Sequence, residues 1–315
     1  MRKVFIVIIS AIAIAGCSSQ PKPSQEPQPE QKQAKAKPQK SYRFSPVKPP
    51  VFMNEEQQRT YMRDHFWDKF DFNDTLATTK ADTLEMLQFF AAYVALYVDR
   101  LDQEPIRKLM ERASASKPMF DYFGMLADKV LHDPNSPYRN DEHYIAVLEA
   151  QIASSHYDKY EKMAPQYDLR IASQNRIGHK ANNFRYTDIS GVTRDLYSLK
   201  NEYIIVYINN PGCNMCRQIT EGLKLSPIIS NMQKSGQLKI VAIYPDEQLD
   251  EWHKHHSDMP AEWINSYDKG CLIDRENLYN VNAIPALYLL DRNKKVLVKD
   301  STDISELESL LVAKN

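Results

Sequence analysis

With 315 residues, the chain is long enough for one large domain or two ordinary ones. Its formal net charge is only −1, so nothing points to a polyanionic partner such as nucleic acid. Glycine is scarce, with 8 residues, and tyrosine is plentiful, with 18, which suits a packed chain of helical and mixed α/β character.

The first residues have the pattern of a secretory signal. A basic start, Met1-Arg2-Lys3, precedes an apolar run over residues 4–13 that is too short to span a bilayer as a mature helix. The run ends in Ile14-Ala15-Gly16-Cys17, which resembles the lipobox of bacterial lipoproteins. The resemblance implies that residues 1–16 are a signal peptide and that Cys17 is lipidated, so that its acyl chains anchor the mature protein. The alternative is an ordinary secretory signal with a chance cysteine.

The residues after Cys17 bear on the location of an anchored protein. Ser18 and Ser19 are not acidic, which by the habit of bacterial lipoproteins favours the outer membrane. No acidic cluster of the kind linked to surface export follows, so we expect the chain to face the periplasm of a Gram-negative cell. Residues 17–50 are rich in Pro, Gln and Lys and almost free of apolar side chains, which predicts a disordered tether. Contact of its Pro-Lys pairs with anionic lipid or cell wall is the alternative.

Helical periodicity begins near residue 51. Asn54 and Gln57 match a capping box, and Pro105 and Pro118 can each begin a helix. The predicted helices are 54–70, 81–101, 105–113, 118–131, 141–154 and 157–173. We therefore predict an all-α domain over residues 51–173, a stretch with no cysteine, metal-spaced histidine pair or phosphate loop in its sequence.

Residues 203–216 carry the clearest chemical signal. The apolar run 204–208 predicts a buried strand, and 209–212 is a turn signal. A helix predicted over 213–225 would then begin with Cys213 and hold Cys216 one turn further on. Free N–H groups at a helix N-terminus favour a thiolate over a thiol, so this Cys-x-x-Cys arrangement indicates a redox-active dithiol.

A second motif, Ile284-Pro285, precedes the apolar run 286–290. Proline cannot donate to a strand ladder, so it belongs at the start or edge of a strand. Together with the cysteine motif, a strand at 295–299 and a closing helix at 301–313, this pattern resembles the thioredoxin superfamily. Within that superfamily it is most similar to the membrane-tethered, TlpA-like thiol-disulfide oxidoreductases, whose N-terminal segment has the form seen here over residues 177–199.

The resemblance implies a fold and a set of roles. Residues 174–315 would form a mixed central sheet flanked by helices, which makes the chain a two-domain α+β protein. Cys213 would attack a substrate disulfide, and Cys216 would resolve the mixed disulfide. The Ile284-Pro285 bond would be cis and would present backbone to the substrate, and Pro211-Gly212 would contact the substrate beside the first cysteine. No cofactor or metal beyond the dithiol is implied.

Two positions depart from the thioredoxin pattern. Pro211-Gly212 stand where a tryptophan usually precedes the first cysteine, and Tyr207 replaces the acidic residue that many thioredoxins bury. Substrate contacts and proton delivery to Cys216 are therefore open, and we expect Tyr207 to be a core residue rather than a proton donor. Residues 65–72 resemble an uncharacterised helical domain found ahead of thioredoxin-like domains in Bacteroides-type lipoproteins. That domain implies no activity, and a partner-docking or substrate-presenting role is a hypothesis from its position.

Metal binding is an alternative use of the cysteines. Zinc would need two further ligands, for which Cys271 and the His253-to-His256 cluster are candidates, although their spacing from Cys213 has no zinc-finger regularity. Copper delivery through cysteine, Met215 and histidine is a second alternative. The runner-up to the redox function, ahead of metal delivery, is a non-enzymatic binding lipoprotein with a static disulfide on a thioredoxin-fold scaffold.

Two further hypotheses concern the segment after the strand predicted over 239–244. Trp252 and Trp263 lie in a polar insertion that we expect to help wall the substrate groove. Cys271, in a short strand predicted over 270–273, is expected to be a buried thiol rather than a third redox partner.

The favoured interpretation is a periplasm-facing, membrane-anchored thiol-disulfide oxidoreductase. Reduction of protein disulfides is favoured over oxidation or isomerisation by the resemblance to the TlpA-like group. The implied partners are protein dithiol or disulfide substrates, a membrane electron donor and the membrane itself through the lipid anchor, with no nucleic acid.

Overall fold

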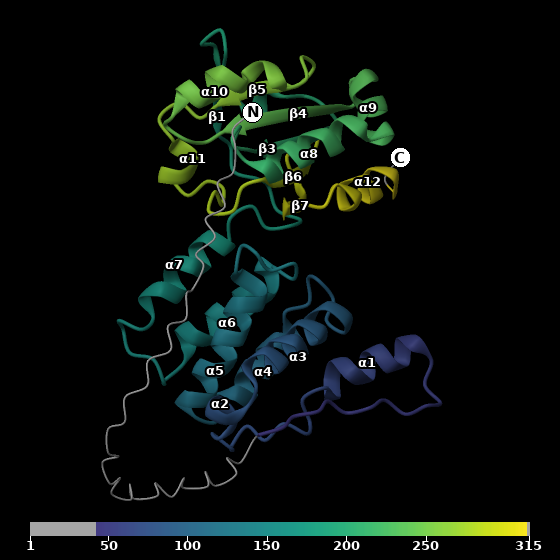
Figure 1. Ribbon diagram of the computed structural model, residues 1–315, viewed down its shortest axis with the longest axis vertical. Coiled ribbons are helices and arrows are strands. Elements are labelled where there is room, and N and C mark those ends of the chain that lie inside the picture. The colour runs from purple at the N-terminus through teal and green to yellow at the C-terminus, as the bar shows by residue number, and fades with distance from the viewer. Residues whose placement is uncertain (1–41, 314–315) are drawn as a thin grey trace, which may run out of the picture. The chain divides into compact units, whose positions relative to one another are not determined.

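The computed structural model describes residues 42–313 (Figure 1). Within this range the helices α1 to α7 come first, and a seven-stranded mixed sheet with flanking helices follows. The predicted two-domain α+β class is confirmed. The predicted signal peptide over residues 1–16, the predicted lipidation site Cys17 and most of the predicted tether lie outside the described residues.

The helical region is built as its capping signals predict. Its elements are α1 (Glu55–His65), α2 (Ala77–Lys80), α3 (Thr83–Leu96), α4 (Glu104–Ala113), α5 (Lys117–Ala127), the π-helical η1 (Asp128–His132), α6 (Asp141–Ala153) and α7 (Met163–Ala172). The capping box of α1 is formed: Asn54 Oδ1 accepts from the Gln57 N–H at 2.9 Å, and the Gln57 side chain accepts from the Asn54 N–H at 3.0 Å. Pro105 and Pro118 lie in the first turns of α4 and α5. Across residues 42–313 none of the helices combines the length and the apolarity that crossing a bilayer requires.

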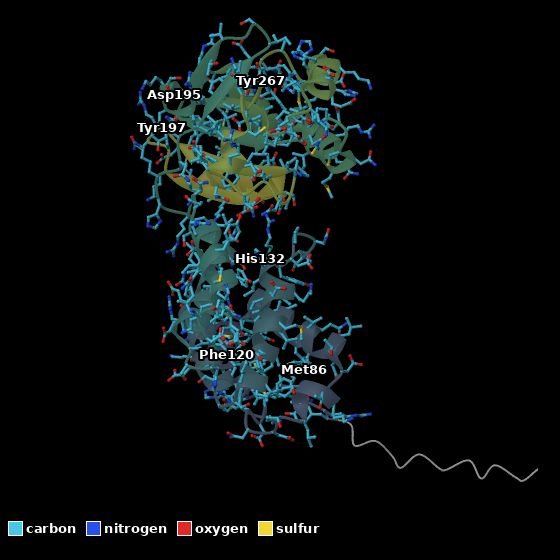
Figure 2. All side chains as sticks on the ribbon, turned by 90° about the vertical axis from the view of Figure 1, so that its left-hand side faces the viewer. Met86, Phe120, His132, Asp195, Tyr197 and Tyr267 are labelled. Carbon is cyan, nitrogen blue, oxygen red and sulfur yellow. The ribbon has the colours of Figure 1, made fainter. Side chains whose placement is uncertain are left out.

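Aromatic side chains fill the core of the helical region. Trp67 is buried, stacks on Phe44 with ring centroids 5.2 Å apart, and meets Phe123 edge-on at 5.4 Å. Met86 of α3 and Phe120 of α5 are buried in the same core (Figure 2). The tether, expected to reach residue 50, therefore ends before Phe44, because that ring is part of the core rather than solvated.

One sheet organises the second region. Its strands are β1 (Arg185–Asp188), β2 (Thr193–Asp195), β3 (Tyr203–Ile208), β4 (Leu238–Tyr244), β5 (Ile264–Tyr267), β6 (Ala286–Asp291) and β7 (Val296–Ser301). Their order across the sheet is β2-β1-β5-β4-β3-β6-β7. β3 pairs in parallel with β4 and antiparallel with β6, so every residue of β3 is buried. This accounts for its continuous apolar run in the sequence.

Alternate side chains of β3 enter two different cores. Ile205 and Tyr207 pack with residues of α8 (Asn214–Leu225), α9 (Pro227–Lys234) and α12 (Ile304–Ala313) on one face of the sheet (Figure 1). Ile204 and Val206 pack on the other face with Phe184 and other buried residues. The remaining short helices are η2 (Leu196–Ser198), α10 (Leu249–His255), η3 (His256–Asp258) and α11 (Leu272–Arg275).

One predicted strand is absent from the structure. Residues 270–273 were expected to be extended, but Gly270 and Cys271 have φ values of 88° and 51°. Positive φ at two successive residues is incompatible with a strand, and the chain turns here into α11. The prediction of a strand at Cys271 is therefore wrong.

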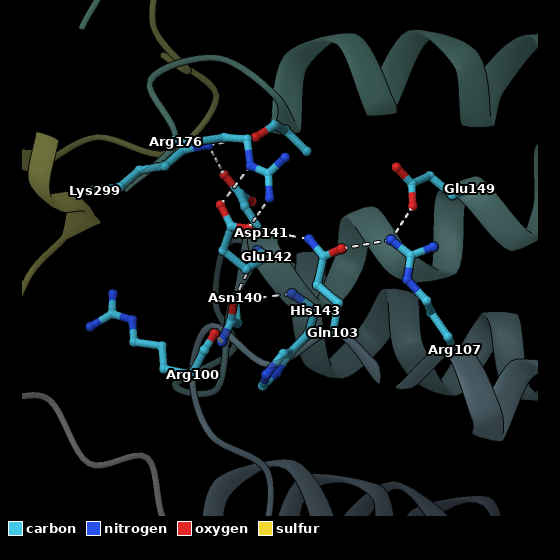
Figure 3. Close-up of polar contacts among 11 residues, drawn as sticks. Arg100, Gln103, Arg107, Asn140, Asp141, Glu142, His143, Glu149, Arg176 and Lys299 are labelled. Carbon is cyan, nitrogen blue, oxygen red and sulfur yellow. Dashed lines mark hydrogen bonds and ion pairs between the residues drawn. The ribbon is translucent and has the colours of Figure 1, made fainter. Parts of the chain in front are cut away.

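Buried ion pairs join the helical region to the sheet. Lys299 Nζ of β7 lies 2.7 Å from the Asp141 carboxylate at the start of α6 and donates to the Ala172 carbonyl at 2.6 Å (Figure 3). Arg139, just before α6, lies 2.7 Å from the Asp300 carboxylate. Since all four charged side chains are largely buried, these contacts fix α6 and α7 against β7.

Candidate active site

Cys213 lies between the end of β3 and the start of α8. It is the N-cap residue of α8, with an extended backbone (φ −85°, ψ 124°). The turn before it is held by Asn210, whose Oδ1 accepts from the Gly212 N–H and whose carbonyl accepts from the Cys213 N–H, both at 3.1 Å. The Asn-Asn-Pro-Gly sequence thus ends the strand and sets the first cysteine at the helix N-terminus, as predicted. Pro211 is half-buried and Gly212 is exposed beside it.

The Cys213 sulfur lies between the helix and the segment that precedes β6. Its Sγ accepts from the Cys216 N–H at 3.2 Å and lies 3.9 Å from the Ile284 carbonyl oxygen. The residue is partly exposed, and both cysteines are free thiols. The sulfur is therefore accessible while it keeps a backbone donor from α8.

Cys216 is in a different environment. It is 3% exposed, and burial raises the pKa of its thiol to about 12. The Asn210 N–H lies 3.4 Å from its Sγ, the one backbone donor the structure gives it. At neutral pH Cys216 is therefore a buried, protonated thiol beneath the more accessible Cys213.

Tyr207 lies in the core beneath Cys216. Its hydroxyl donates to the Cys216 carbonyl at 2.7 Å and lies 3.2 Å from the Thr220 hydroxyl. Burial raises the pKa of Tyr207 well above its ordinary value, so the hydroxyl stays protonated. A neutral donor bonded to the helix backbone stands here in place of the buried acid that many thioredoxins have, and Tyr207 is a core residue as expected.

The Ile284-Pro285 peptide is cis, as the resemblance implied. Pro285 is buried and Ile284 is half-buried. The next residue, Ala286, begins β6 and pairs with Ile208 at the end of β3. This register brings the cis peptide next to the turn that carries Cys213.

A cleft of about 880 Å³ opens beside the cis peptide. Met215, which is 50% exposed, lines it together with Ile284 and Pro285. The helical region supplies much of the remaining lining through Arg59, Arg100 and residues 134–143. Sequence reasoning did not predict this contribution, because Asp133 to Pro137 gave only a loop signal.

Comparisons with known proteins agree with this fold. Residues 201–296 match a family described as thioredoxin-like, and residues 17–175 match a domain of unknown function, DUF5106. The crystal structure of a thioredoxin-like protein from Bacteroides caccae is 41% identical, with a TM-score of 0.81 over 88% of this chain and 100% of that chain. The chain belongs to the thioredoxin superfamily.

Two further solved structures match a part of this thioredoxin-superfamily chain. The C-terminal domain of an uncharacterized protein from Bacteroides fragilis is 51% identical, covering 44% of this chain and 98% of that one, with a TM-score of 0.43. The thioredoxin domain of a thiol-disulfide oxidoreductase from Bacteroides vulgatus is 21% identical, covering 44% and 97%, with a TM-score of 0.39. No curated protein matches the chain.

The other candidate metal ligands, Cys271 and the His253-to-His256 cluster, do not form a metal site with the cysteine pair. Cys271 is buried at the start of α11, where burial raises the pKa of its thiol. His255 of the histidine cluster lies 2.9 Å from the Asp258 carboxylate within the same helical segment. Among residues 42–313 no group of three or more His, Cys, Asp or Glu side chains could hold a metal ion.

The expected tryptophan wall is contradicted. Trp252 is buried and its indole N–H donates to Asn265 Oδ1 at 3.2 Å, and Trp263 is buried in the core beneath Tyr207. Neither ring lines the cleft at the cis peptide. Both are core residues, because β4 and β5 pair directly and draw the insertion onto the sheet.

Proposed function

We propose that this chain is a thiol-disulfide oxidoreductase in which Cys213 attacks and Cys216 resolves. The observation that carries the proposal is the placement of the Cys213 sulfur, partly exposed at the N-cap of α8 and 3.9 Å from the carbonyl of Ile284 before the cis proline. Cys216, buried one turn further on, is out of reach of a bulky substrate.

The proposed reaction is two successive thiol-disulfide exchanges. The Cys213 thiolate attacks one sulfur of the substrate disulfide, so that a Cys213–substrate bond forms and the substrate S–S bond breaks. The departing substrate sulfur takes up a proton. Cys216 then gives up its proton and attacks the Cys213 sulfur, which releases the second substrate thiol. Two electrons and two protons pass to the substrate, and the protein dithiol becomes a disulfide.

The raised pKa of Cys216 fits the resolving role. A buried, protonated thiol does not compete with Cys213 for the incoming disulfide. Once a mixed disulfide occupies Cys213, Cys216 is its nearest thiol in the same helix turn. Its backbone N–H already lies 3.2 Å from the Cys213 sulfur.

We also propose that electrons flow from the protein to its substrates. Reduction is favoured by the similarity to TlpA-like proteins, and each turnover then requires a membrane dithiol donor to reduce the Cys213–Cys216 disulfide again. The reduction potential of the pair tests the direction. A value near about −270 mV supports a reductase, whereas one near about −120 mV would mean disulfide insertion.

Trapping the intermediate tests the roles of the two sulfurs. In the chain from Ser18 onward, Cys216→Ser should accumulate a mixed disulfide between Cys213 and a protein substrate, and Cys213→Ser should form none. Cys271→Ser is the matched control and should behave as the unaltered chain does. A disulfide that never exchanges with thiols would support a static scaffold instead, and metal that co-purifies in stoichiometric amount would support metal delivery.

We further propose that Cys17 anchors the protein to the membrane, with the outer membrane favoured and the folded part in the periplasm. The support is the small-residue pair before Cys17 at the end of a short apolar run. Membrane fractionation tests it, because Cys17→Ala should move the protein out of the membrane fraction. Retention of that variant in the membrane would count against a lipid anchor.

A further inference from the structure

The cleft beside Cys213 has walls from both halves of the chain. The thioredoxin-like half contributes Met215, Ile284 and Pro285, and the helical half contributes Arg59, Arg100 and the loop over residues 134–140. Its volume of about 880 Å³ is in the range of sites that enclose a ligand or a short peptide segment. Cys213 is not one of the lining residues, but its sulfur lies 3.9 Å from the carbonyl oxygen of Ile284, which lines the cleft. A substrate in this cleft that reaches Cys213 therefore also meets the helical region.

The helical wall is held in place by buried charge. Lys299 pairs with Asp141 at 2.7 Å and Arg139 with Asp300 at 2.7 Å. Arg176 adds a bidentate contact to the buried Glu142, with its Nε at 2.9 Å (Figure 3). Side chains that have lost their hydration keep these partners, since separation would leave a charge buried and unpaired. The cleft is thus preformed rather than assembled by substrate.

The exposed charged side chains of this cleft include two arginines. The carboxylates of Asp141, Glu142 and Asp300 face it but are covered by their partners. Arg59 and Arg100 are 53% and 49% exposed. Two further carboxylates line the cleft. Asp303 is exposed, and its Oδ1 already accepts two hydrogen bonds from Ser305, while Glu306 is 21% exposed and pairs with Arg100.

The two guanidinium groups have donors to spare. Arg59 pairs with Asp99 and Arg100 with Glu306, each through one terminal nitrogen. A guanidinium has five N–H donors, so both arginines can bind a further carboxylate. The apolar side chains of Val98 and Met215 line the same cleft.

We propose that the helical region selects the substrate: the cleft binds the peptide segment that flanks a substrate disulfide and favours segments in which an acidic side chain reaches Arg59 and Arg100. This inference rests on the proposed oxidoreductase function and names its substrate class. A peptide fits the lining because apolar side chains and exposed guanidinium groups line the same cleft.

Single-turnover oxidation of the reduced dithiol tests the selection. Two disulfide peptides are compared that share the same cysteines but carry flanking Glu or flanking Lys. The unaltered chain should react about fivefold faster with the Glu peptide, a size typical of one or two partly exposed ion pairs. Arg59→Gln with Arg100→Gln should remove this preference, and added salt should reduce it.

Two control variants test whether the effect is specific to the cleft arginines. Arg107→Gln removes a similarly exposed arginine that pairs with Glu149 and does not line the cleft, so the preference should persist. Glu306→Gln breaks the same ion pair as Arg100→Gln but leaves the guanidinium in place, so its preference should also persist. If Glu306→Gln loses the preference as fully as Arg100→Gln does, the arginine acts by holding the fold, and the proposal is overturned.

Bis(2-hydroxyethyl) disulfide separates this inference from the function on which it rests. This small neutral disulfide should oxidise the unaltered chain and the arginine variants at equal rates. If it fails to react with any of them, the oxidoreductase function fails. Binding is then measured with Cys213→Ser, Cys216→Ser protein and a Glu-rich peptide that has Ser in place of Cys. Binding that needs Arg59 and Arg100 supports the cleft, and equal binding of Glu and Lys peptides overturns it.

Discussion

Cys213 and Cys216 lie one helical turn apart, but their surroundings differ. The helix start leaves Cys213 partly exposed and turns Cys216 toward the sheet, where it is buried. Burial disfavours the charged form of any acid, so it raises the pKa of the Cys216 thiol, while the sulfur of Cys213 keeps a backbone donor. The different roles of the two sulfurs therefore follow from the positions of Cys213 and Cys216 at the start of α8.

Alkylation should report this difference. With the reduced protein at pH 7 to 8, iodoacetamide should modify Cys213 at least about 100-fold faster than Cys216, because the thiolate is the nucleophile and Cys216 stays protonated until the pH nears its raised pKa. Peptide mass analysis of timed samples measures both rates. Comparable rates at the two positions would contradict the assignment of Cys213 as the attacking thiol.

Tyr207 should matter for stability more than for chemistry. Tyr207→Phe removes the donor to the Cys216 carbonyl and should lower the free energy of unfolding by about 1 kcal/mol. The rate of oxidation by a small disulfide should stay within about threefold of the unaltered chain, a change of less than about 1 kcal/mol in the barrier.

Tyr203→Phe, in the same strand, is the matched control for the stability measurement. Urea unfolding gives both values. A large fall in the oxidation rate with Tyr207→Phe would instead make its hydroxyl part of the proton path to Cys216.

At the scale of single elements, local signals predicted most of the fold. The capping box at Asn54, the prolines in the first turns of α4 and α5 and the apolar run of β3 each act over a few residues, and each element formed where its signal lies. The strand predicted at Cys271 failed because positive φ at that residue depends on how the chain turns into α11, which periodicity does not encode.

The candidate site was predictable in part for the same reason. Cys213 and Cys216 share one local motif, and the resemblance supplied the partner segment at Ile284. The helical wall could not be predicted, because the contacts that place it, such as Arg139 with Asp300, join residues far apart in the chain. The same holds for Phe44, whose burial depends on Trp67 rather than on its polar neighbours in the sequence.

The break between α8 and α9 gives a test at this scale. Ser226 caps α9: its Oγ accepts from the Ile229 N–H at 3.1 Å in a buried setting. Ser226→Ala should lower the free energy of unfolding by about 1 to 2 kcal/mol, because the loss of an N-cap leaves a helix N–H without a partner. Ser230→Ala, inside the same helix, should change it by less than about 0.5 kcal/mol. Equal effects in urea unfolding would show that the cap does not matter.

At the scale of the whole molecule, the ion pair between Arg139 and Asp300 connects the helical region to β7. Burial and ion pairing have opposite effects on the pKa of Asp300. The carboxyl group pairs with Arg139 and lies among Asp141, Lys299 and the buried Tyr288. Burial outweighs the attraction of Arg139 and raises the pKa of Asp300 from 3.8 to about 6. Between these two pKa values Asp300 of the folded chain holds a proton that the unfolded chain has released. Near neutral pH, ionisation of Asp300 in the folded chain therefore costs free energy.

This shift predicts how stability depends on pH. Between pH 4 and 6 the folded chain binds more protons at Asp300 than the unfolded chain does, so this group makes the free energy of unfolding fall as pH rises, by about 3 kcal/mol for a shift of roughly two units. Asp300→Asn removes the titrating group, and Asn tolerates the φ of 51° at this position.

Urea unfolding from pH 4 to 7, followed by the fluorescence of Trp67, Trp252 and Trp263, measures the difference between the unaltered chain and Asp300→Asn. The unaltered chain should lose stability relative to Asp300→Asn as pH rises. The difference should level off about one unit above pH 6, where Asp300 is ionised in both the folded and the unfolded chain. The reverse slope would mean that Arg139 and Lys299 hold the folded carboxylate ionised at all these pH values. In that case acidification would break the ion pair between Arg139 and Asp300 and lower the free energy of unfolding. The helical wall of the cleft would then loosen at low pH rather than near neutral pH.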